Sequence, residues 1–565
     1  MILTMTDLPV FLNRISVAIG CWALFFNGLL LTGYLVTGYE QHLHSDSAVR
    51  LLLAEEVIRT GELMPSNWNF VNADLWLLSA HWFAIPFLAF SPASPLVHGL
   101  SGAISAAFVT MSLWSLMVAL NTPLSRRIWL TALLFSGFSG VAAEGLFGQA
   151  SYGMIFASIV LMLAAVIHIL EGKHTPWGWT ILVAILSALQ IATNPLRGII
   201  FCLLPLSLAM CFVSWNCLFK RRFVVHDPTP EMPSIPAAKF LTLTGMMLLG
   251  VSVGAVIRAT LTPSLIQIPG VMSDFLQVAT LQQLPSILAV LLEGVLASLG
   301  SRPSPAPALS TEGMYHLFRL LLAVIAVALV VRAIMIGLAD KRRSRRLLTF
   351  FTVSSFLIVA FICIGTNLLL LSPDIEGIRY LLPATVLLLF LVFTDSSDWR
   401  ASPVIATLSL VLALGFAASG YANLFMVDVA SKWKTHERDA YAWQSRELAS
   451  LLQEEGLEYG YATYWLANSA TVHSSGGVKV RPIILKNGLP TPRHWLSSNH
   501  WYSPNAWSGE SFLALTAEEV KLVDYDQLEL ESLKPNRIIK KKGFEILVFP
   551  VNLSARLAWG ASVLQ

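Results

Sequence analysis

Charged residues, in one case with a neighbouring amide, stand at the ends of apolar segments in four parts of the sequence. They are Asp46, Glu144, Asn194 with Arg197, and Arg379. Ionisable groups at membrane depth are costly, so they usually have a partner or a task. A carboxylate can remove the proton of an attacking hydroxyl, and a guanidinium binds phosphate through charge-assisted, often bidentate hydrogen bonds. Together these residue types suit the transfer of a group from a phosphate to a hydroxyl.

Asp46 lies in the segment 39–62, directly after the first apolar stretch. It starts a helical pattern that Gly61 ends, and the apolar positions of this pattern share one face: Val49, Leu52, Leu53 and Val57. We therefore expect a short amphipathic helix at the membrane surface. Asp46 within Ser-Asp-Ser fits a helix N-cap or a general base, and one residue can do both.

The other charged candidates also have ordinary alternatives. Glu144 could be a solvated loop acid, and Arg197, which follows Asn194-Pro195, could extend its side chain to the lipid headgroups. Arg379 could anchor its helix at the interface, paired with Glu376. These structural roles of Glu144, Arg197 and Arg379 stay open as alternatives to a role in an active site.

Several histidines add polar groups near Asp46. His81 and Asn72 flank a short apolar segment and could line a polar cavity. His42 and His44 with Asp46 form a His-x-His-x-Asp pattern, which is a weak metal signal without a further ligand. The sequence identifies no cofactor with certainty, and a divalent metal stays an open alternative.

The composition indicates an integral membrane protein. Of the 565 residues, 55% are hydrophobic and 13% charged, against about 25% charged in soluble proteins. The net charge of +3 is small, and we expect no nucleic-acid partner. The five cysteines all fall in apolar stretches and are typical of buried, unreactive thiols.

The hydropathy pattern predicts many membrane-spanning helices. A helix needs about 20 apolar residues to cross a bilayer, with a range of about 17–25. We expect 11–13 spans, with eleven placed at 15–37, 97–120, 128–148, 152–171, 177–193, 198–218, 239–260, 316–338, 347–371, 380–396 and 402–426. The apolar segments 75–90 and 284–299 are shorter, and we interpret both as interfacial or re-entrant.

Basic clusters orient these spans, because cytoplasmic loops are rich in Lys and Arg. The clusters at 126–127, 173, 220–222 and 341–346 all fall on one side of the predicted topology. The four candidate positions of the first paragraph fall on the opposite, non-cytoplasmic side. This shared side is not expected if each residue were merely a cap or an anchor.

The composition changes near residue 427. We predict a transmembrane domain over 1–426 and a small α/β domain over 427–565, a usual domain size. Residues 433–460 are charged and helix-like, while 478–485 and 544–549 alternate in the manner of strands.

The pattern resembles the GT-C superfamily of polyprenyl-phosphate-sugar glycosyltransferases, especially protein O-mannosyltransferases and the lipid A aminoarabinose transferase. The resemblance rests on four features: an acid after the first span with a helix ending Arg59-Thr60-Gly61-Glu62, Glu144 before Tyr152-Gly153-Met154, Arg379-Tyr380-Leu381-Leu382-Pro383, and the segment 459–467. The likeness covers most of the chain loosely.

This resemblance implies a many-span fold with a cavity on the non-cytoplasmic face, in which Asp46 is the general base and Glu144 a second acid. It implies that Arg379 contacts the lipid phosphate and that transfer inverts configuration. Candidate substrate-binding residues are Arg197, Arg379, Tyr380, His81 and Asn194.

The partners implied by the resemblance are a polyprenyl-phosphate-linked sugar donor, a glycan, lipid or protein acceptor, and the lipid bilayer. We expect a multi-pass inner-membrane protein whose C-terminal domain is periplasmic or extracellular. Members of this family often have two adjacent acids, Asp-Glu, in the first loop, whereas here Ser47 follows Asp46. This difference leaves metal dependence open.

Two other classes compete with an enzyme. A transporter or lipid flippase with a soluble accessory domain would be expected to show inverted repeats or broken helices in matched positions, and the sequence shows neither. A structural membrane protein that presents its C-terminal domain is the third class.

Overall fold

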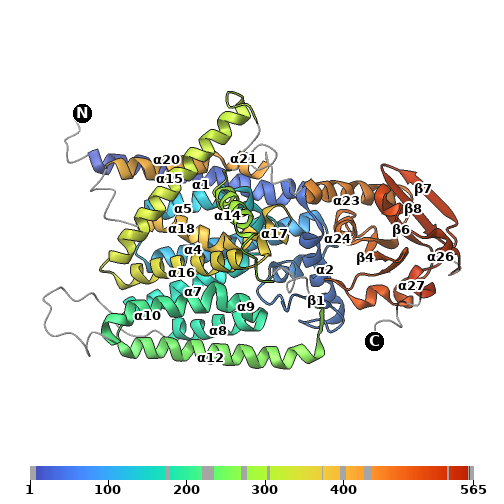
Figure 1. Ribbon diagram of the computed structural model, residues 1–565, viewed down its shortest axis with the longest axis horizontal. Helices are drawn as coiled ribbons and strands as arrows, with labels where there is room; N and C mark the ends of the chain where they lie inside the picture. Colours follow the sequence, from blue (N-terminus) through green and yellow to red (C-terminus); the bar gives the residue numbers. More distant parts are fainter. Residues whose placement is uncertain are drawn as a thin grey trace.

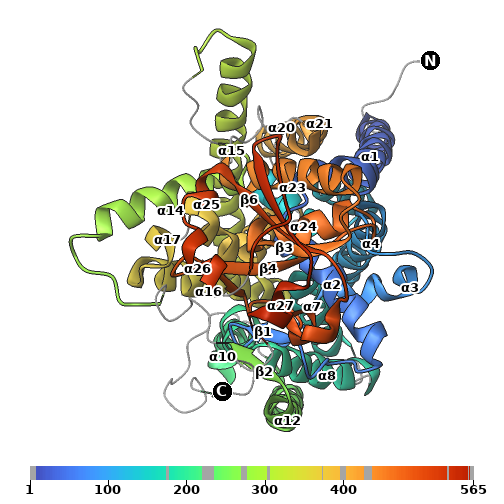
Figure 2. The same ribbon diagram turned by 90° about the vertical axis from the view of Figure 1, so that its right-hand side faces the viewer.

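The computed structural model describes residues 8–172, 177–218, 235–268, 276–301, 306–371, 373–394, 403–425, 436–530, 533–557 and 559. Long helices form one part of the molecule, and a β-sheet with its own helices is attached at one end (Figure 1). Viewed from that end, the sheet lies across the tips of the helices (Figure 2).

The helical part crosses a membrane many times. Within the described residues, nine helices are long and apolar enough to span a bilayer: Arg14–His42, Pro95–Ala119, Gly153–Glu171, Pro195–Ser214, Ala237–Ser264, Thr311–Ala339, Arg343–Gly365, Gly377–Thr394 and Pro403–Phe425. Each contains or overlaps a predicted span. The helix α8 (Trp177–Thr193) has 17 residues, which is the lower limit for a crossing.

The predicted span 128–148 is wrong as one straight helix. It consists of α5 (Leu124–Phe135) and a segment Gly140–Gly148 that are bent by 86°. Gly137 between them has a φ of +63°, a backbone conformation that glycine adopts easily, and the Ser139 side chain accepts a hydrogen bond from the Ala142 backbone N–H. Counting this pair as one span, up to ten such spans lie within the described residues, compared with the 11–13 expected for the chain.

The helices pack in neighbouring pairs around one large apolar core. The main contacts join α4 (Pro95–Ala119) to α7 (Gly153–Glu171), α1 (Leu8–Gly33) to α5, and α12 (Ala237–Leu261) to α8. In α12, a Cβ on Gly250 would lie 2.3 Å from the Ala184 carbonyl oxygen. Small residues let membrane helices approach this closely, which explains the tight α12–α8 contact.

The remaining helices complete the bundle. They include α10 (Leu204–Leu218), α14 (Leu284–Ser298), α15 (Thr311–Ala339), α16 (Arg343–Gly365), α18 (Leu382–Thr394) and α20 (Pro403–Ala418). The segment 75–90 forms only two short helices, η3 (Ala80–Phe83) and α3 (Ile85–Leu88), and α14 has 15 residues. Neither segment is long enough to span, as predicted.

A buried arginine joins three of these elements. Arg319 of α15 is fully buried and donates hydrogen bonds to the carbonyl oxygens of Gly300, at 2.9 Å, Leu299, at 3.0 Å, and Phe138. Its guanidinium carbon lies 4.9 Å from the centre of the Phe416 ring. These contacts connect α15 to the end of α14 and to the bend after α5.

The helix that begins near Asp46 is α2 (Ser45–Thr60), and it ends at Gly61, whose φ is +71°. The prediction of an amphipathic surface helix is wrong. Val49, Leu52, Leu53 and Val57 are buried as expected, but most residues on the other faces are buried too. The reason is that α24 (Tyr464–His473) of the C-terminal part packs against α2.

The C-terminal part contains a six-stranded sheet with strand order β5-β4-β3-β6-β8-β7. The strands are β3 (Tyr459–Thr463), β4 (Lys479–Lys486), β5 (Leu489–Pro492), β6 (Ser511–Thr516), β7 (Arg537–Lys541) and β8 (Phe544–Phe549). The strand β3 pairs in parallel with β4 and β6, and the other pairs are antiparallel. The predicted helix corresponds to α23 (His436–Glu454) and the two predicted strands to β4 and β8.

Within the helical part, a short strand β1 (Asn69–Val71) pairs in parallel with β2 (Ile266–Ile268). Hydrogen bonds connect the C-terminal part to β1 and to α2. The Asn69 backbone N–H donates to the Ser497 carbonyl at 2.8 Å, and Ser498 Oγ donates to Glu56 Oε1 of α2 at 2.6 Å. The predicted domain boundary at 426/427 lies outside the described residues.

Candidate active site

A cavity of about 510 Å³ lies between the bundle and the C-terminal part. We call it the first cavity. Residues from α2, from the loop after β1, from the start of α7 and from α24 all line it. Its polar and aromatic lining includes Asp46, Arg50, Asn72, Asp74, Trp76, Tyr152, Arg197, Arg379, Tyr380, Tyr464, Trp465, Arg493 and Trp495.

Asp46 lies in the first turn of α2 and lines the first cavity. The N-cap residue of α2 is His44, so Asp46 does not occupy the N-cap position. The Tyr464 hydroxyl donates a hydrogen bond to Asp46 Oδ1 at 2.7 Å, and Ser45 Oγ donates to the Tyr464 carbonyl oxygen. A residue of the C-terminal part therefore fixes the position of the Asp46 carboxylate by a hydrogen bond.

Glu144 lies in the π-helical turn η4 (Ala143–Gly148), within the bent segment. Its Oε1 accepts hydrogen bonds from the Tyr39 hydroxyl at 2.8 Å and from His44 Nε2 at 3.2 Å. Tyr39 also shares a hydrogen bond of 2.7 Å with Ser47. Glu144 is thus connected to residues on both sides of Asp46 without itself lining the first cavity, so it organises the turn that carries Asp46.

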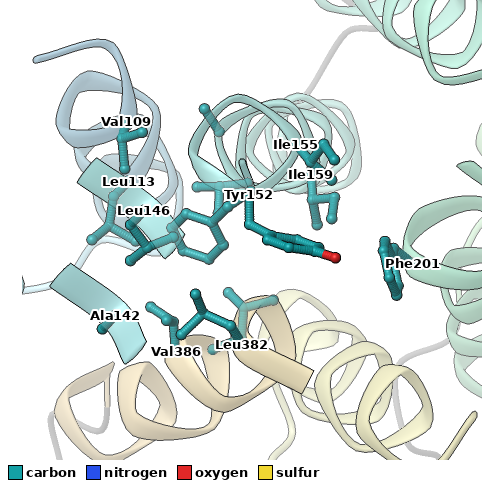
Figure 3. Close-up of a cluster of buried hydrophobic side chains, with 14 of the residues drawn as sticks. Val109, Leu113, Ala142, Leu146, Tyr152, Ile155, Ile159, Phe201, Leu382 and Val386 are labelled. Carbon is teal, nitrogen blue, oxygen red and sulfur yellow. The ribbon is translucent and has the colours of Figure 1, made fainter. Parts of the chain in front are cut away.

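The basic residues Arg197 and Arg379 line the first cavity together. Arg197 forms an ion pair with Asp74, and its side chain is 24% exposed. The Arg379 guanidinium carbon lies 5.7 Å from the centre of the Tyr380 ring. Tyr152 lines the same cavity, and its ring packs among apolar side chains with its hydroxyl turned toward Phe201 (Figure 3).

A second cavity of about 710 Å³ adjoins the first. The two cavities share Asn72, Arg197 and Tyr380, and most other residues of the second are apolar, among them Leu196, Ile200, Phe201, Leu276, Val359, Ile362 and Leu368. Asn194 lines only the second cavity; its side chain caps α9 (Pro195–Gly198) by accepting the Arg197 backbone N–H at 3.1 Å. The arrangement suits a ligand with a polar head and an apolar chain.

His81 does not line either of these cavities. It is 2% exposed, lies with its ring centre 4.2 Å from that of Trp82, and borders a small void beside Arg50. Burial and the nearby positive charge of Arg50 lower its pKa to about 3, so the ring is neutral at physiological pH. The structure therefore places His81 behind the cavity wall.

The predicted metal pattern is not gathered into a site in the described ranges. No group of three His, Cys, Asp or Glu side chains there could hold a metal ion. His44 contacts Glu144, while Asp46 accepts from Tyr464. The residues that surround Asp46 are thus hydrogen-bond donors rather than additional ligands.

Sequence reasoning missed several residues of the cavity. Tyr464 and Trp465 lie in the segment 459–467 that supports the resemblance, but about four hundred residues separate them from Asp46, and no local pattern assigns them to its cavity. Arg50 offered a signal, because it is a single charge inside the run Ala-Val-Arg-Leu-Leu-Leu-Ala. Asp74 had no signal of its own. The loop that carries it has three non-glycine residues at positive φ, Asn72, Ala73 and Trp76, and such strain is concentrated at functional sites.

Replacing Tyr464 with phenylalanine tests the link between the two parts of the chain. The change removes the hydroxyl that donates to Asp46, and a hydrogen bond to a charged group contributes about 1.5–3 kcal/mol. We expect an activity that depends on the Asp46 carboxylate to fall about ten-fold or more, with folding retained. The matched control is Tyr525→Phe, whose hydroxyl donates to Glu545 outside the cavity. Equal activity of both variants would contradict a positioning role for Tyr464.

The comparisons with known proteins agree with this architecture. No family profile and no curated protein sequence matches the chain. Among solved structures, ArnT from Cupriavidus metallidurans, the lipid A aminoarabinose transferase, is similar along nearly its whole length. The form bound to undecaprenyl phosphate has a TM-score of 0.51 at 11% identity, and the apo form 0.52 at 10%. Each match covers 96% of this chain and 98% of the other. The fold predicted from the sequence resemblance, a GT-C-like polytopic bundle with a C-terminal α/β part, is confirmed.

Proposed function

We propose that this protein is a membrane glycosyltransferase that moves a sugar from a polyprenyl-phosphate carrier to a hydroxyl group of an acceptor. The observation that carries the proposal is the first cavity. It places the Asp46 carboxylate in the same space as the Arg197 and Arg379 guanidiniums, and it adjoins an apolar cavity. The resolved neighbour of the same fold is bound to undecaprenyl phosphate, which is a ligand of this kind.

The carrier fits across the two cavities. Its phosphate lies near Arg379 and Arg197, where charge-assisted hydrogen bonds bind it, and its prenyl chain occupies the apolar second cavity. Tyr380 borders both spaces, and its ring is 5.9 Å from that of Tyr152 and 6.5 Å from that of Phe201. Asn194 shapes the second cavity by fixing the start of α9.

Asp46 acts as the general base. It takes the proton of the acceptor hydroxyl while the acceptor oxygen bonds to the anomeric carbon. The bond between that carbon and the phosphate oxygen breaks, and the carrier leaves as polyprenyl phosphate. A single displacement of this kind inverts the configuration. Glu144 supports the base indirectly through His44 and Tyr39, which flank the turn that carries Asp46.

The chain is oriented with its sheet on the non-cytoplasmic side of the inner membrane. The basic turn between α15 and α16 lies at the end of the bundle away from the sheet (Figure 1), and such clusters favour the cytoplasm. We keep the proposed division into a transmembrane domain over 1–426 and a second domain over 427–565. The second domain contributes residues 463–465, 483–484, 493 and 495–496 to the lining of the first cavity, so the acceptor, which is a glycan, lipid or protein, enters against them.

A transfer assay tests the proposal. The purified protein in nanodiscs is offered a panel of polyprenyl-phosphate sugars, and both polyprenyl phosphate release and sugar transfer are measured. We expect acceptor-dependent release from one donor class. Movement of the lipid between leaflets without cleavage of the sugar would instead support the transporter or flippase alternative.

Arg379→Gln is expected to weaken donor binding. The variant removes one charged donor at the phosphate, so the KM for the donor rises about ten-fold or more. The matched control is Arg59→Gln on α2, whose side chain pairs with Glu56 outside the cavity. An unchanged donor KM in Arg379→Gln would remove Arg379 from the phosphate site.

A further inference from the structure

The transfer mechanism above gives no role to two arginines of the first cavity, Arg50 and Arg493, and of these Arg50 lies beside Asp46. It lies one helical turn after Asp46 on α2, so both side chains project from the same side of the helix. Both line the first cavity. The Arg50 guanidinium carbon lies 5.8 Å from the centre of the Trp76 ring, which lines the same space.

Two of the three guanidinium nitrogens of Arg50 have no hydrogen-bond partner in the described residues. These atoms, Nε and Nη1, are buried, and the residue as a whole is 9% exposed. A buried charged donor without a partner costs free energy. Burial lowers the pKa of Arg50 to about 10, so the group remains a cation at physiological pH. The unpaired guanidinium lowers the stability of the protein, and a bound anion that accepts its hydrogen bonds would offset this loss.

The nearest acids do not satisfy this cation. Asp46, Glu144 and Asp74 all act on Arg50 through their charges, yet Arg50 forms no ion pair with them, and Asp74 pairs with Arg197. Four arginines and two aspartates line the first cavity, which leaves two positive charges in excess. The phosphodiester of the sugar-linked donor carries one negative charge, so it balances only one of them.

Arg50 also lies away from the lipid end of the cavity. The apolar second cavity shares Asn72, Arg197 and Tyr380 with the first, but neither Arg50 nor Asp46 lines it. Arg50 instead borders the small void behind the wall, together with His81 and Gln149. The first cavity thus has a lipid end, with Arg197 and Tyr380, and an acid end, with Asp46 and Arg50.

We propose that Arg50 forms a second anion-binding site at the acid end, which takes a phosphate or carboxylate group carried by the acceptor or by the transferred sugar. This inference rests on the proposed function, and it specifies the substrate class: one substrate beyond the carrier phosphate is acidic. The attacking hydroxyl meets Asp46 at this end, so an acidic group beside it would be held by the guanidinium one turn away.

Binding measurements test the site without turnover. The full-length protein in nanodiscs, saturated with undecaprenyl phosphate in a phosphate-free buffer, is titrated with inorganic phosphate as the probe. We expect wild type to bind the probe, and Arg50→Gln to weaken this binding about ten-fold or more. Arg50→Lys should retain part of it, and Arg59→Gln should match wild type. Because an unpaired buried charge is removed, Arg50→Gln should unfold at or above the wild-type temperature.

Two results would overturn the site. One is probe binding that is unchanged in Arg50→Gln. The other is a loss of undecaprenyl phosphate affinity in Arg50→Gln as large as that in Arg379→Gln, which would assign Arg50 to the carrier phosphate. If the Arg50-dependent binding is present but no donor supports transfer, the proposed function fails while the site stands.

Kinetics with an active donor and acceptor pair then identify the source of the acidic group. A higher KM for the acceptor in Arg50→Gln places the group on the acceptor, and a higher KM for the donor places it on the sugar. In either case, the neutral analogue of that substrate should no longer distinguish wild type from Arg50→Gln. Unchanged KM values for both substrates would contradict the proposal.

Discussion

Replacing Asp46 with asparagine is expected to lower kcat/KM for sugar transfer by about 100- to 10,000-fold, the range that a general base contributes. Asparagine is close in size to aspartate, and its oxygen can still accept the hydrogen bond from Tyr464. It cannot take a proton from the acceptor. The dissociation constant for undecaprenyl phosphate should remain within a few-fold of the wild-type value, because the carrier lies at the lipid end.

The stability of the Asp46→Asn variant separates chemistry from helix capping. His44 is the N-cap residue of α2, so the variant loses no N-cap hydrogen bond, and the lost interaction of a carboxylate with the helix dipole costs about 0.3–1 kcal/mol. A matched control is Glu40→Gln, whose carboxylate pairs with Arg446 at 3.4 Å. Normal transfer by Asp46→Asn, or a loss of activity that follows unfolding, would remove Asp46 as the base.

The sequence predicted the parts of the fold that depend on apolar length. A bilayer requires about 20 apolar residues in a crossing helix, so each span leaves a local signal whatever its neighbours are. The bend after α5 left a weaker signal. It depends on one glycine at positive φ and two serines around it, within a stretch whose hydropathy continues across the break.

The candidate site was predictable only in part, because it is built from distant segments. Asp46, Arg197 and Arg379 each stood out as charges at apolar boundaries, and the structure brings all three to one cavity. Tyr464 reaches the same cavity through the packing of α24 on α2. That packing also explains why α2 is buried on most faces. The spacing of apolar residues in a sequence predicts which face of a helix is apolar, but it does not show that another element covers the polar face.

Arginine at membrane depth does not always indicate a ligand, and Arg319 provides the test. We expect Arg319→Met to lower the free energy of unfolding by about 3–5 kcal/mol, the cost of breaking a buried polar cluster. The carbonyl oxygens of Phe138, Leu299 and Gly300 would lose their donor in a buried environment. Reversible unfolding in mixed detergent micelles measures this change.

The surroundings of Arg319 provide an independent variant. A Cβ on Gly300 would lie 1.7 Å from Arg319 Nη2, and Gly300 has a φ of +71°. Gly300→Ala must therefore displace the guanidinium and destabilise the protein in the same way. Arg332→Met on the same helix, which is only half-buried, is the control and should cost less than about 1 kcal/mol. The contrast with Arg50 lies in the share of donors that is used: Nε and Nη2 of Arg319 bind three carbonyls of the fold and only its Nη1 has no partner in the described residues, whereas both Nε and Nη1 of Arg50 have none there. If Arg319→Met were as stable as wild type but inactive, this distinction between structural and ligand-binding arginines would fail.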